Sequence, residues 1–357
     1  MTHCSTMLSG SVAAPAPLPF RPPRREGEMP WEEAADRHRR RLAAERAART
    51  APWAETELDA ELARQTVRLT ALQAEHLDLL DEGRLGEESP VRGLARQLDG
   101  VELEAAVRER REWVADAAPP RLVGTPALTD DRHFRRRWER AQAATAKPVK
   151  LATIGPRSFA GALDDTVHGL DVDAGAHAVA EALNPGLRRL ADAGCPALEL
   201  VEPALLTAAP AATPTGFEAI ARALHKVPRE TARWLRLVPA DGREPWLGPP
   251  PPGLRLETIA AILADLPIDG VVVERAVALD GAAVIERLAR LRVAVIVVPA
   301  DAAGASVVDD AADALARLGA VTAPGRLVAA VDGGGAQARV PLARRLEWLV
   351  RAARATT

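Results

Sequence analysis

The chain has 357 residues, of which 48% are hydrophobic and 27% charged, so most of it is predicted to fold around a buried core. The formal net charge of -3 excludes the basic surface typical of nucleic-acid binding, and no apolar run reaches the roughly 20 residues of a membrane helix. Two cysteines, Cys4 and Cys195, cannot form a disulfide framework, and the first residues lack a signal-peptide pattern. We therefore expect a soluble cytoplasmic protein that binds a small molecule, with no nucleic-acid or membrane partner, while its oligomeric state stays open.

The first 80 residues are predicted to contain an extended segment and two helices. Residues 14–23 are rich in proline, which indicates an extended or polyproline-like conformation. Residues 30–50 begin with a proline and two glutamates and then become basic, the charge order that suits a helix dipole. Leucines recur at helical spacing over 57–80. The two segments predict a helical hairpin, broken near Pro52.

Beyond Pro119 short apolar runs alternate with amphipathic stretches, which predicts parallel strands that alternate with helices. The amphipathic stretches are 177–193, 215–227, 254–265, 281–291 and 307–319. The apolar runs are 151–154, 198–201, 235–238, 271–273, 293–298 and 327–331, with earlier candidates near 7–12 and 121–124. Eight such strands favour an α/β fold of the (β/α)8 type, a TIM barrel. An open dinucleotide-binding sheet is the weaker alternative, because no GxGxxG follows the first strand.

Acidic residues follow these strands with unusual regularity. They are Glu202, Asp241, Glu274, Asp301 and Asp332. In a (β/α)8 barrel the chemistry lies at the carboxyl ends of the strands, so converging carboxylates there predict a site. The alternative is that some of them only cap the following helix, an interpretation we favour for Asp241 and Asp301.

Histidine and cysteine offer no metal-binding pattern. None of the seven histidines falls in an H-x-C, H-x-x-x-H or H-E-x-x-H spacing. Cys195 lies between a helix end and a strand start, which in a barrel is the end opposite the catalytic face. It is predicted to be a small buried group. The sequence therefore predicts no metal ligand from these residue types.

Seven blocks resemble, in order, the catalytic C-terminal barrel of cobalamin-independent methionine synthase, within the superfamily that includes uroporphyrinogen decarboxylase. They are LSGSVAAP (8–15), REGE (25–28), DEGRLGEES with ARQLDGVEL (81–103), KPVKLATIGP (147–156), ADAGCPALELVEPAL (191–205), VVVERA (271–276) and VAAVDGGGAQAR (328–339). The third block is similar to the family's second strand and the helix that follows it. The resemblance implies one barrel domain over 1–357, with 25–80 as a helical excursion after the first strand.

The family moves a methyl group from a folate to the sulfur of homocysteine, using a zinc ion that activates the thiol. The resemblance places a His-x-Cys zinc pair in the segment LRLVPADG, which instead contains Arg236, Leu237, Val238 and Pro239. It keeps one zinc ligand as Glu274, whereas Gly333 replaces the cysteine of the last loop. One carboxylate cannot bind zinc at useful affinity, so we expect no zinc, while a folate-type methyl donor stays open.

The resemblance also implies a partly retained amino-acid pocket. Gly10 and Ser11 match the family's Gly-Ser turn, and Pro156 ends the block that matches best, so these three residues are candidates for substrate binding. Val201 stands where the family has an aspartate. The family's second-strand glutamate aligns with Arg84, and a shift of register would bring Glu82 or Glu87 to this place.

Three hypotheses follow. The first is a divergent, methyltransferase-type enzyme in which Glu202, Glu274 and Asp332 act as acid or base groups without zinc. The second is a non-catalytic binding or regulatory relative, which the glycine-rich stretch 333–335 and the proline-rich loop 248–253 favour because both are poor in functional groups. The third is a methyltransferase with a different donor or acceptor, whose substrate supplies the nucleophile.

Overall fold

The computed structural model describes twelve segments of the chain, and the structural statements below concern these residues. They are 5–9, 55–83, 90–102, 119–129, 132–163, 171–206, 213–238, 256–288, 290–299, 302–304, 306–332 and 340–356. The chain forms two compact units, of which the first comprises residues 1–14 and 66–357 and the second residues 15–65. In the second unit, the structure describes only the beginning of helix α2 (Glu55–Ala74).

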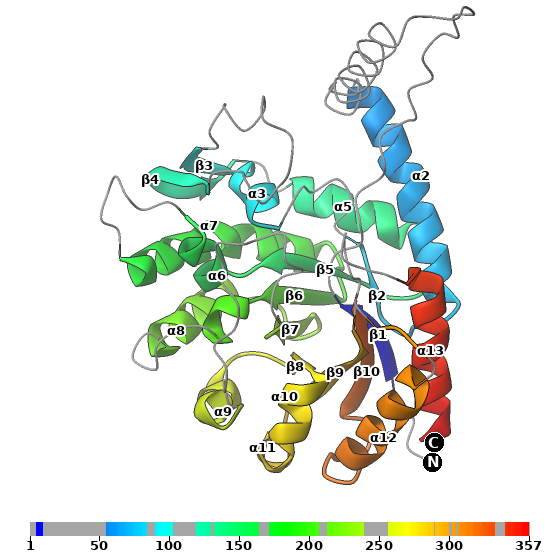
Figure 1. Ribbon diagram of the computed structural model, residues 1–357. Coiled ribbons are helices and arrows are strands. Elements are labelled where there is room, and N and C mark those ends of the chain that lie inside the picture. The colour runs from blue at the N-terminus through cyan, green and yellow to red at the C-terminus, as the bar shows by residue number, and fades with distance from the viewer. Residues whose placement is uncertain are drawn as a thin grey trace, which may run out of the picture. The chain divides into compact units, whose positions relative to one another are not determined.

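Eight parallel strands form the centre of the first unit, in the order β1-β10-β9-β8-β7-β6-β5-β2 (Figure 1). An isolated parallel bridge between Met7 and Leu79 joins the two ends of this sheet. The strands are β1 (Ser5–Ser9), β2 (Leu80–Asp81), β5 (Val149–Ile154), β6 (Ala197–Val201), β7 (Ala232–Arg236), β8 (Gly270–Glu274), β9 (Arg292–Val298) and β10 (Leu327–Asp332). The predicted (β/α)8 barrel is therefore confirmed.

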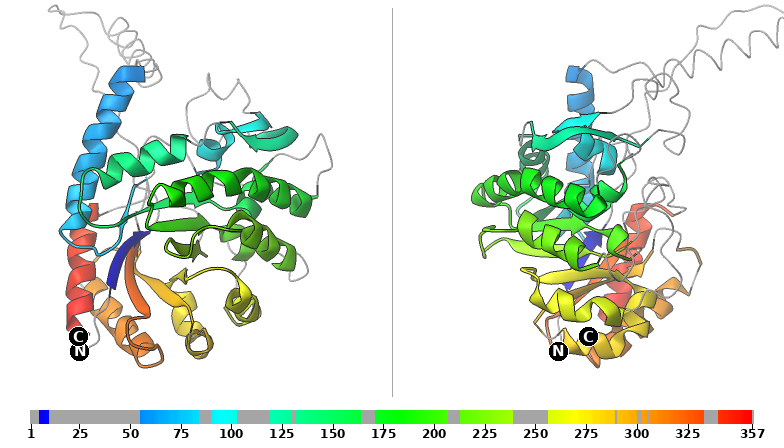
Figure 2. Two further views of the ribbon diagram at one scale, coloured as in Figure 1. Left: turned by 180° about the vertical axis from the view of Figure 1, so that it is seen from behind. Right: turned by 90° about the vertical axis from the view of Figure 1, so that its left-hand side faces the viewer.

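Helices follow the strands along the chain and lie outside them (Figure 1; Figure 2). After β5 come α6 (Pro156–Gly161) and α7 (Val172–Asp192), and after β6 come η2 (Pro203–Leu206) and α8 (Thr213–Ala223). The later helices are α9 (Leu256–Asp265), α10 (Arg275–Asp280), α11 (Ala282–Arg287), α12 (Val307–Gly319) and α13 (Leu342–Ala355). No helix in the segments described above is both long and apolar enough to cross a membrane.

The barrel's second strand differs from the one that the apolar runs predicted and lies at the start of the block that resembles the family's second strand. The apolar run near 121–124 belongs to β4 (Arg121–Leu128), which pairs antiparallel with β3 (Leu98–Glu102) in a separate two-stranded sheet. Residues 95–103, which resemble a helix of the family, therefore contain a strand, after the short helix α3 (Pro90–Ala95). The second barrel strand is β2, which has only two residues, and Asp81 follows Leu80 there, so no apolar run marks it.

The predicted helices agree better with the structure. The stretch 177–193 lies almost wholly in α7, 254–265 covers α9, and 307–319 coincides with α12. In α12 the buried residues recur at helical spacing, which is why the pattern was visible in the sequence: they are Val307, Ala311, Ala314, Leu315 and Leu318. Helix α5 (Arg132–Gln142) precedes β5 and was not predicted. The hairpin arm predicted over 30–50 lies outside the described residues.

Two apolar clusters make up the core of the first unit. The larger one lies between the strands and the surrounding helices. The smaller one contains residues from β1, β6, β7, β8, β9 and β10: Met7, Ala197, Trp234, Val272, Ala294, Ile296, Val328 and Ala330. Because neighbouring residues of a strand point to opposite faces, these residues define the inner face of the barrel.

Candidate functional site

Three charged residues end their strands on the inner face of the barrel. Arg236, Glu274 and Asp332 are the last residues of β7, β8 and β10. Each lies two positions after a residue of the inner cluster, so its side chain belongs to the same face. The structure therefore brings two of the predicted acids to the carboxyl end of the barrel, where barrel enzymes have their chemistry.

Arg236 and Asp332 form an ion pair at this end. The guanidinium Nη2 lies 3.7 Å from Asp332 Oδ1, and the two side chains are 3% and 16% exposed. The main chain of Arg236 also holds the residue after β6, because its carbonyl accepts a hydrogen bond from the N–H of Glu202 at 2.8 Å. Sequence reasoning named Arg236 only as a missing zinc ligand and did not predict this pair.

Glu274 occupies the N-cap position of α10 without capping it. Its backbone is extended, and its side chain makes no capping hydrogen bond. The residue is exposed, although the four residues before it in β8 are buried. Helix capping, the plain structural explanation for an acid at this position, therefore does not account for Glu274.

Glu202 is fully buried and binds the start of α6. Its Oε1 accepts the N–H of Arg157 at 3.0 Å, and its Oε2 accepts the N–H of Ser158 at 2.7 Å. These N–H groups lie in the first turn of the helix, where they have no partner within the helix itself. In return, Ser158 Oγ accepts the N–H of Ala204 at 3.0 Å. The carboxylate therefore joins the turn after β5 to the turn after β6.

Gly155 and Pro156 complete this arrangement. A Cβ atom at Gly155 would overlap with the carboxyl group of Glu202, so only glycine leaves the necessary room. Pro156, predicted to bind substrate, is buried at the first position of α6, where its missing N–H has no cost. Burial raises the pKa of Glu202 to about 7, against the opposing effect of its hydrogen bonds to Ser158 and Arg157.

Glu82, which directly follows β2, is also held by its neighbours. Its Oε1 accepts hydrogen bonds from Arg137 of α5 and, at 3.3 Å, from the N–H of Ala152 in β5. Arg137 additionally donates to the carbonyl of Ala152 at 3.2 Å. The side chain of Glu82 is 1% exposed. Glu82 is one of the two glutamates that a register shift could bring to the family's position. The other, Glu87, lies outside the described residues.

A charged cluster lies deeper in the barrel. Lys150 of β5 forms an ion pair with Glu199 of β6 and another, at 3.2 Å, with Asp81 of β2, and all three side chains are buried. Glu199 Oε1 has no hydrogen-bond partner among the described residues, and neither has the indole N–H of Trp234. The sequence carried one signal for this cluster, since Lys150 and Glu199 are charged residues within otherwise apolar strands.

The structure does not describe five of the residues named from the sequence, and it places Cys195 away from the strand ends. Gly10, Ser11, Asp241, Asp301 and Gly333 lie outside the described residues. The prediction that Cys195 is buried is confirmed, since the residue is 1% exposed and burial raises the pKa of its thiol to about 12.

Arg345 of α13 fixes the residues on both sides of the last loop. Its guanidinium donates to the carbonyl of Asp332 and, at 3.1 Å, to the carbonyl of Val340. The residue is 1% exposed, and burial lowers its pKa although the nearby Asp332 carboxylate opposes this. The end of β10 is therefore held in place by α13.

The described side chains at this end do not form a zinc site. In the segment where the resemblance places a His-x-Cys pair, Arg236 carries a positive charge and Val238 is an apolar side chain with 2% exposure. Within the described segments, no group of three or more His, Cys, Asp or Glu side chains could hold a metal ion. A guanidinium beside the remaining carboxylates would repel a divalent cation.

Comparisons with known proteins agree on the fold. No family model and no curated protein matches the sequence. A B12-independent methionine synthase from Shewanella sp. W3-18-1, solved with selenomethionine, has a TM-score of 0.72 at 17% identity, and the match covers 99% of this chain and 96% of that one. A putative vitamin-B12 independent methionine synthase from Listeria monocytogenes has a TM-score of 0.60 at 14% identity, covering 97% and 96%.

A methyltransferase from Methanosarcina mazei is also similar, with a TM-score of 0.55 at 15% identity over 85% of this chain and 88% of that one. At these identities the likeness shows a shared barrel fold. Methionine synthase-like proteins and a methyltransferase are thus among the structural neighbours of this chain.

Proposed function

We propose that the chain is a divergent relative of cobalamin-independent methionine synthase, a methyltransferase-type barrel that does not use the usual zinc-thiolate mechanism. The observation that carries this proposal is the ion pair between Arg236 and Asp332. A guanidinium stands in the segment where the resemblance puts the zinc-binding pair, and a carboxylate from another strand pairs with it. A monovalent organic cation thus supplies positive charge at this end of the barrel, and no step of the reaction passes through zinc.

The charges at the strand ends suit a small ligand with both an acidic and a basic group, such as an amino acid. Arg236 would bind a carboxylate, since a guanidinium presents two parallel N–H donors to it. Asp332, which lies beside Arg236, would bind an ammonium group, and Glu274 would face the same ligand. Because both acids are the last residues of their strands and belong to the inner face of the barrel, the ligand would lie across the strand ends.

Glu274 is the best candidate for a catalytic base among the three acids. It is exposed and does not cap its helix, so its carboxylate can reach a bound ligand. Methyl transfer to a group that is already nucleophilic needs a base to accept the proton that the group loses, and needs no metal to lower its pKa. A folate-type compound would be the methyl donor that the resemblance implies. Its methyl–nitrogen bond would break, and the nitrogen would take up a proton as the acceptor's proton passes to Glu274.

Glu202, predicted to be catalytic, has a different role in this proposal. Both of its oxygens accept backbone N–H groups, and no part of the residue is exposed. We therefore assign it to positioning the turn that contains Gly155 and Pro156. Substrate binding by Gly10 and Ser11 stays a prediction from the resemblance.

A non-catalytic binding protein is the second candidate. It is favoured by the pairing of the Glu82 and Glu202 carboxylates with protein groups, which leaves fewer acids for chemistry. Such a protein would bind the same class of ligand at the same end of the barrel and would release it unchanged.

The test combines metal analysis with an assay of methyl transfer. Purified full-length protein is analysed for zinc and is then incubated with isotope-labelled methyltetrahydrofolate and a panel of amino-acid and thiol acceptors, with and without a chelator. We expect zinc far below one ion per chain and methyl transfer that the chelator does not change. Glu274→Gln should reduce the rate at least tenfold, since general-base catalysis typically contributes about 100-fold or more.

The matched control is Asp309→Asn, which changes an exposed acid in the first turn of α12 and should leave the rate unchanged. One zinc ion per chain, or activity that the chelator abolishes, would contradict the proposed mechanism. Ligand binding without methyl transfer, detected as a thermal shift that Glu274→Gln reduces, would favour the binding protein.

A further inference from the structure

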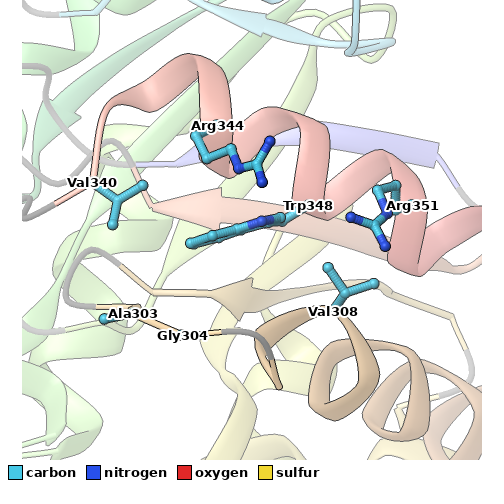
Figure 3. Close-up of a pocket in the computed structure, with 7 residues that line it drawn as sticks. All are labelled: Ala303, Gly304, Val308, Val340, Arg344, Trp348 and Arg351. Carbon is cyan, nitrogen blue, oxygen red and sulfur yellow. The ribbon is translucent and has the colours of Figure 1, made fainter.

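A pocket of about 500 Å³ lies between α12 and α13 (Figure 3). Its walls are formed by Arg344, Trp348 and Arg351 of α13, by Val308 of α12 and by the short segment after β9 that contains Gly304. No strand residue lines it, so it is separate from the site at the strand ends. Its volume lies within the range of pockets that bind small molecules.

The α13 side of this pocket combines an aromatic ring with two cations. Residues 344, 348 and 351 are spaced by four and three positions, so they share one face of the helix. Figure 3 shows these side chains on the side of α13 that faces Ala303, Gly304 and Val308. The Arg344 guanidinium lies 5.9 Å from the centre of the Trp348 ring, a cation–π distance.

The two arginines differ in how far their charges are balanced. Arg344 forms an ion pair with Glu347 at 2.9 Å. Arg351 is exposed and has no ion-pair partner in the part of the chain that the structure describes. The pocket therefore has a surplus of positive charge beside an aromatic ring and apolar walls.

We propose that this pocket binds a small anion that carries a planar aromatic ring, such as a nucleoside monophosphate or an aromatic carboxylate. The ring would lie against Trp348 and the aliphatic side chains, and the phosphate or carboxylate would bind Arg351, with Arg344 nearby.

Gly304 contributes by its backbone conformation. Its φ of +103° is one that other residues rarely adopt, and a Cβ atom there would meet nothing within 4 Å. Gly304 therefore adds no side chain to this wall of the pocket. Together these features favour a flat ligand.

Isothermal titration calorimetry of the full chain tests the proposal with defined probes. The ring-bearing anions are adenosine 5′-monophosphate and 2-naphthoate, the neutral ring compounds are adenosine and 2-naphthalenemethanol, and the anion without a ring is inorganic phosphate. We expect at least one ring-bearing anion to bind about tenfold more tightly than its neutral counterpart and than phosphate, and to bind more weakly as salt is added.

Two variants locate the binding. Arg351→Gln should weaken binding of the ring-bearing anion about tenfold, because an exposed charge that donates to the anion is lost. Arg317→Gln, at an exposed arginine in the last turn of α12 outside the pocket, should not change it. Trp348→Phe keeps an aromatic core residue while reducing the ring surface, and should also weaken binding.

Three results would overturn the proposal: no heat of binding with either ring-bearing anion, equal affinity for the neutral compounds, or equal affinity in Arg351→Gln and Arg317→Gln. Phosphate binding as strong as that of adenosine 5′-monophosphate would reduce the site to one for simple anions and would equally contradict a role for the ring. None of these results bears on methyl transfer at the strand ends.

Discussion

The Nη2 atom of Arg236 lies 3.7 Å from Oδ1 of Asp332, although β8 and β9 separate their strands in the sheet. The pair thus spans the carboxyl end of the barrel and joins segments that are distant in the sequence. Its guanidinium is almost completely buried, so its charge depends on this carboxylate for compensation more than a surface arginine would.

Asp332→Asn should therefore destabilise the protein by about 1–3 kcal/mol, because Arg236 remains buried without its charged partner. The measurement is the free energy of unfolding from urea denaturation. The control is Glu181→Gln, which breaks an exposed ion pair with Arg222 at 2.8 Å and should cost less than about 1 kcal/mol. Equal losses for the two variants would mean that the buried pair contributes no more than a surface pair.

Gly155→Ala should destabilise the protein by about 1–3 kcal/mol, because the added methyl group overlaps with the Glu202 carboxyl group. Gly161→Ala, at the end of the same helix, is the matched control, since a Cβ there meets nothing within 4 Å. Thermal unfolding of the two variants and of the wild type measures the difference. If Gly155→Ala were as stable as Gly161→Ala, the close contact between the two turns would be refuted.

Glu202 should make stability depend on pH. Its pKa in the folded protein is raised to about 7, whereas the ordinary value is 4.5, so between these values the folded state binds the proton more strongly than the unfolded chain does. This contribution to the free energy of unfolding is complete below about pH 4.5, falls as pH rises toward 7 and is then lost. Each unit of pKa difference corresponds to about 1.4 kcal/mol.

The comparison of wild type with Glu202→Gln isolates this contribution, because the amide does not titrate. The difference between their unfolding free energies should fall with rising pH from about 4.5 to 7 and stay constant above that range. Parallel curves over this range would show that Glu202 has the same pKa in both states.

Lys150→Met should cost about 3–5 kcal/mol, since it leaves the buried carboxylates of Asp81 and Glu199 without their common cation. Urea denaturation again provides the measurement. Lys226→Met is a suitable control, because that lysine is exposed in the turn after α8. A loss as small as that of the control would contradict a stabilising role for Lys150 between these two carboxylates.

The fold could be predicted largely from local pattern. Six of the eight barrel strands contain a short apolar run, because a strand covered on both faces is mostly apolar, and α12 shows helical spacing of its buried residues. The second strand shows no local pattern, because two residues, one of them charged, cannot form one, and only the resemblance of the block that begins at residue 81 pointed to it. The run near 121–124 was misassigned because an apolar run indicates a strand without indicating its partner.

For the site too, one part could be predicted from the sequence and another part could not. The sequence by itself determined that acids follow the strands and that Glu274 and Asp332 reach the carboxyl end of the barrel, because strand direction fixes where each strand stops. Only the tertiary structure decided that Glu202 binds the first turn of α6, that Arg236 pairs with Asp332, and that Lys150 lies between two carboxylates. Each of these pairings depends on which strands are neighbours and on which side chains face inward, and a charged residue's place in the chain does not reveal its partner in space.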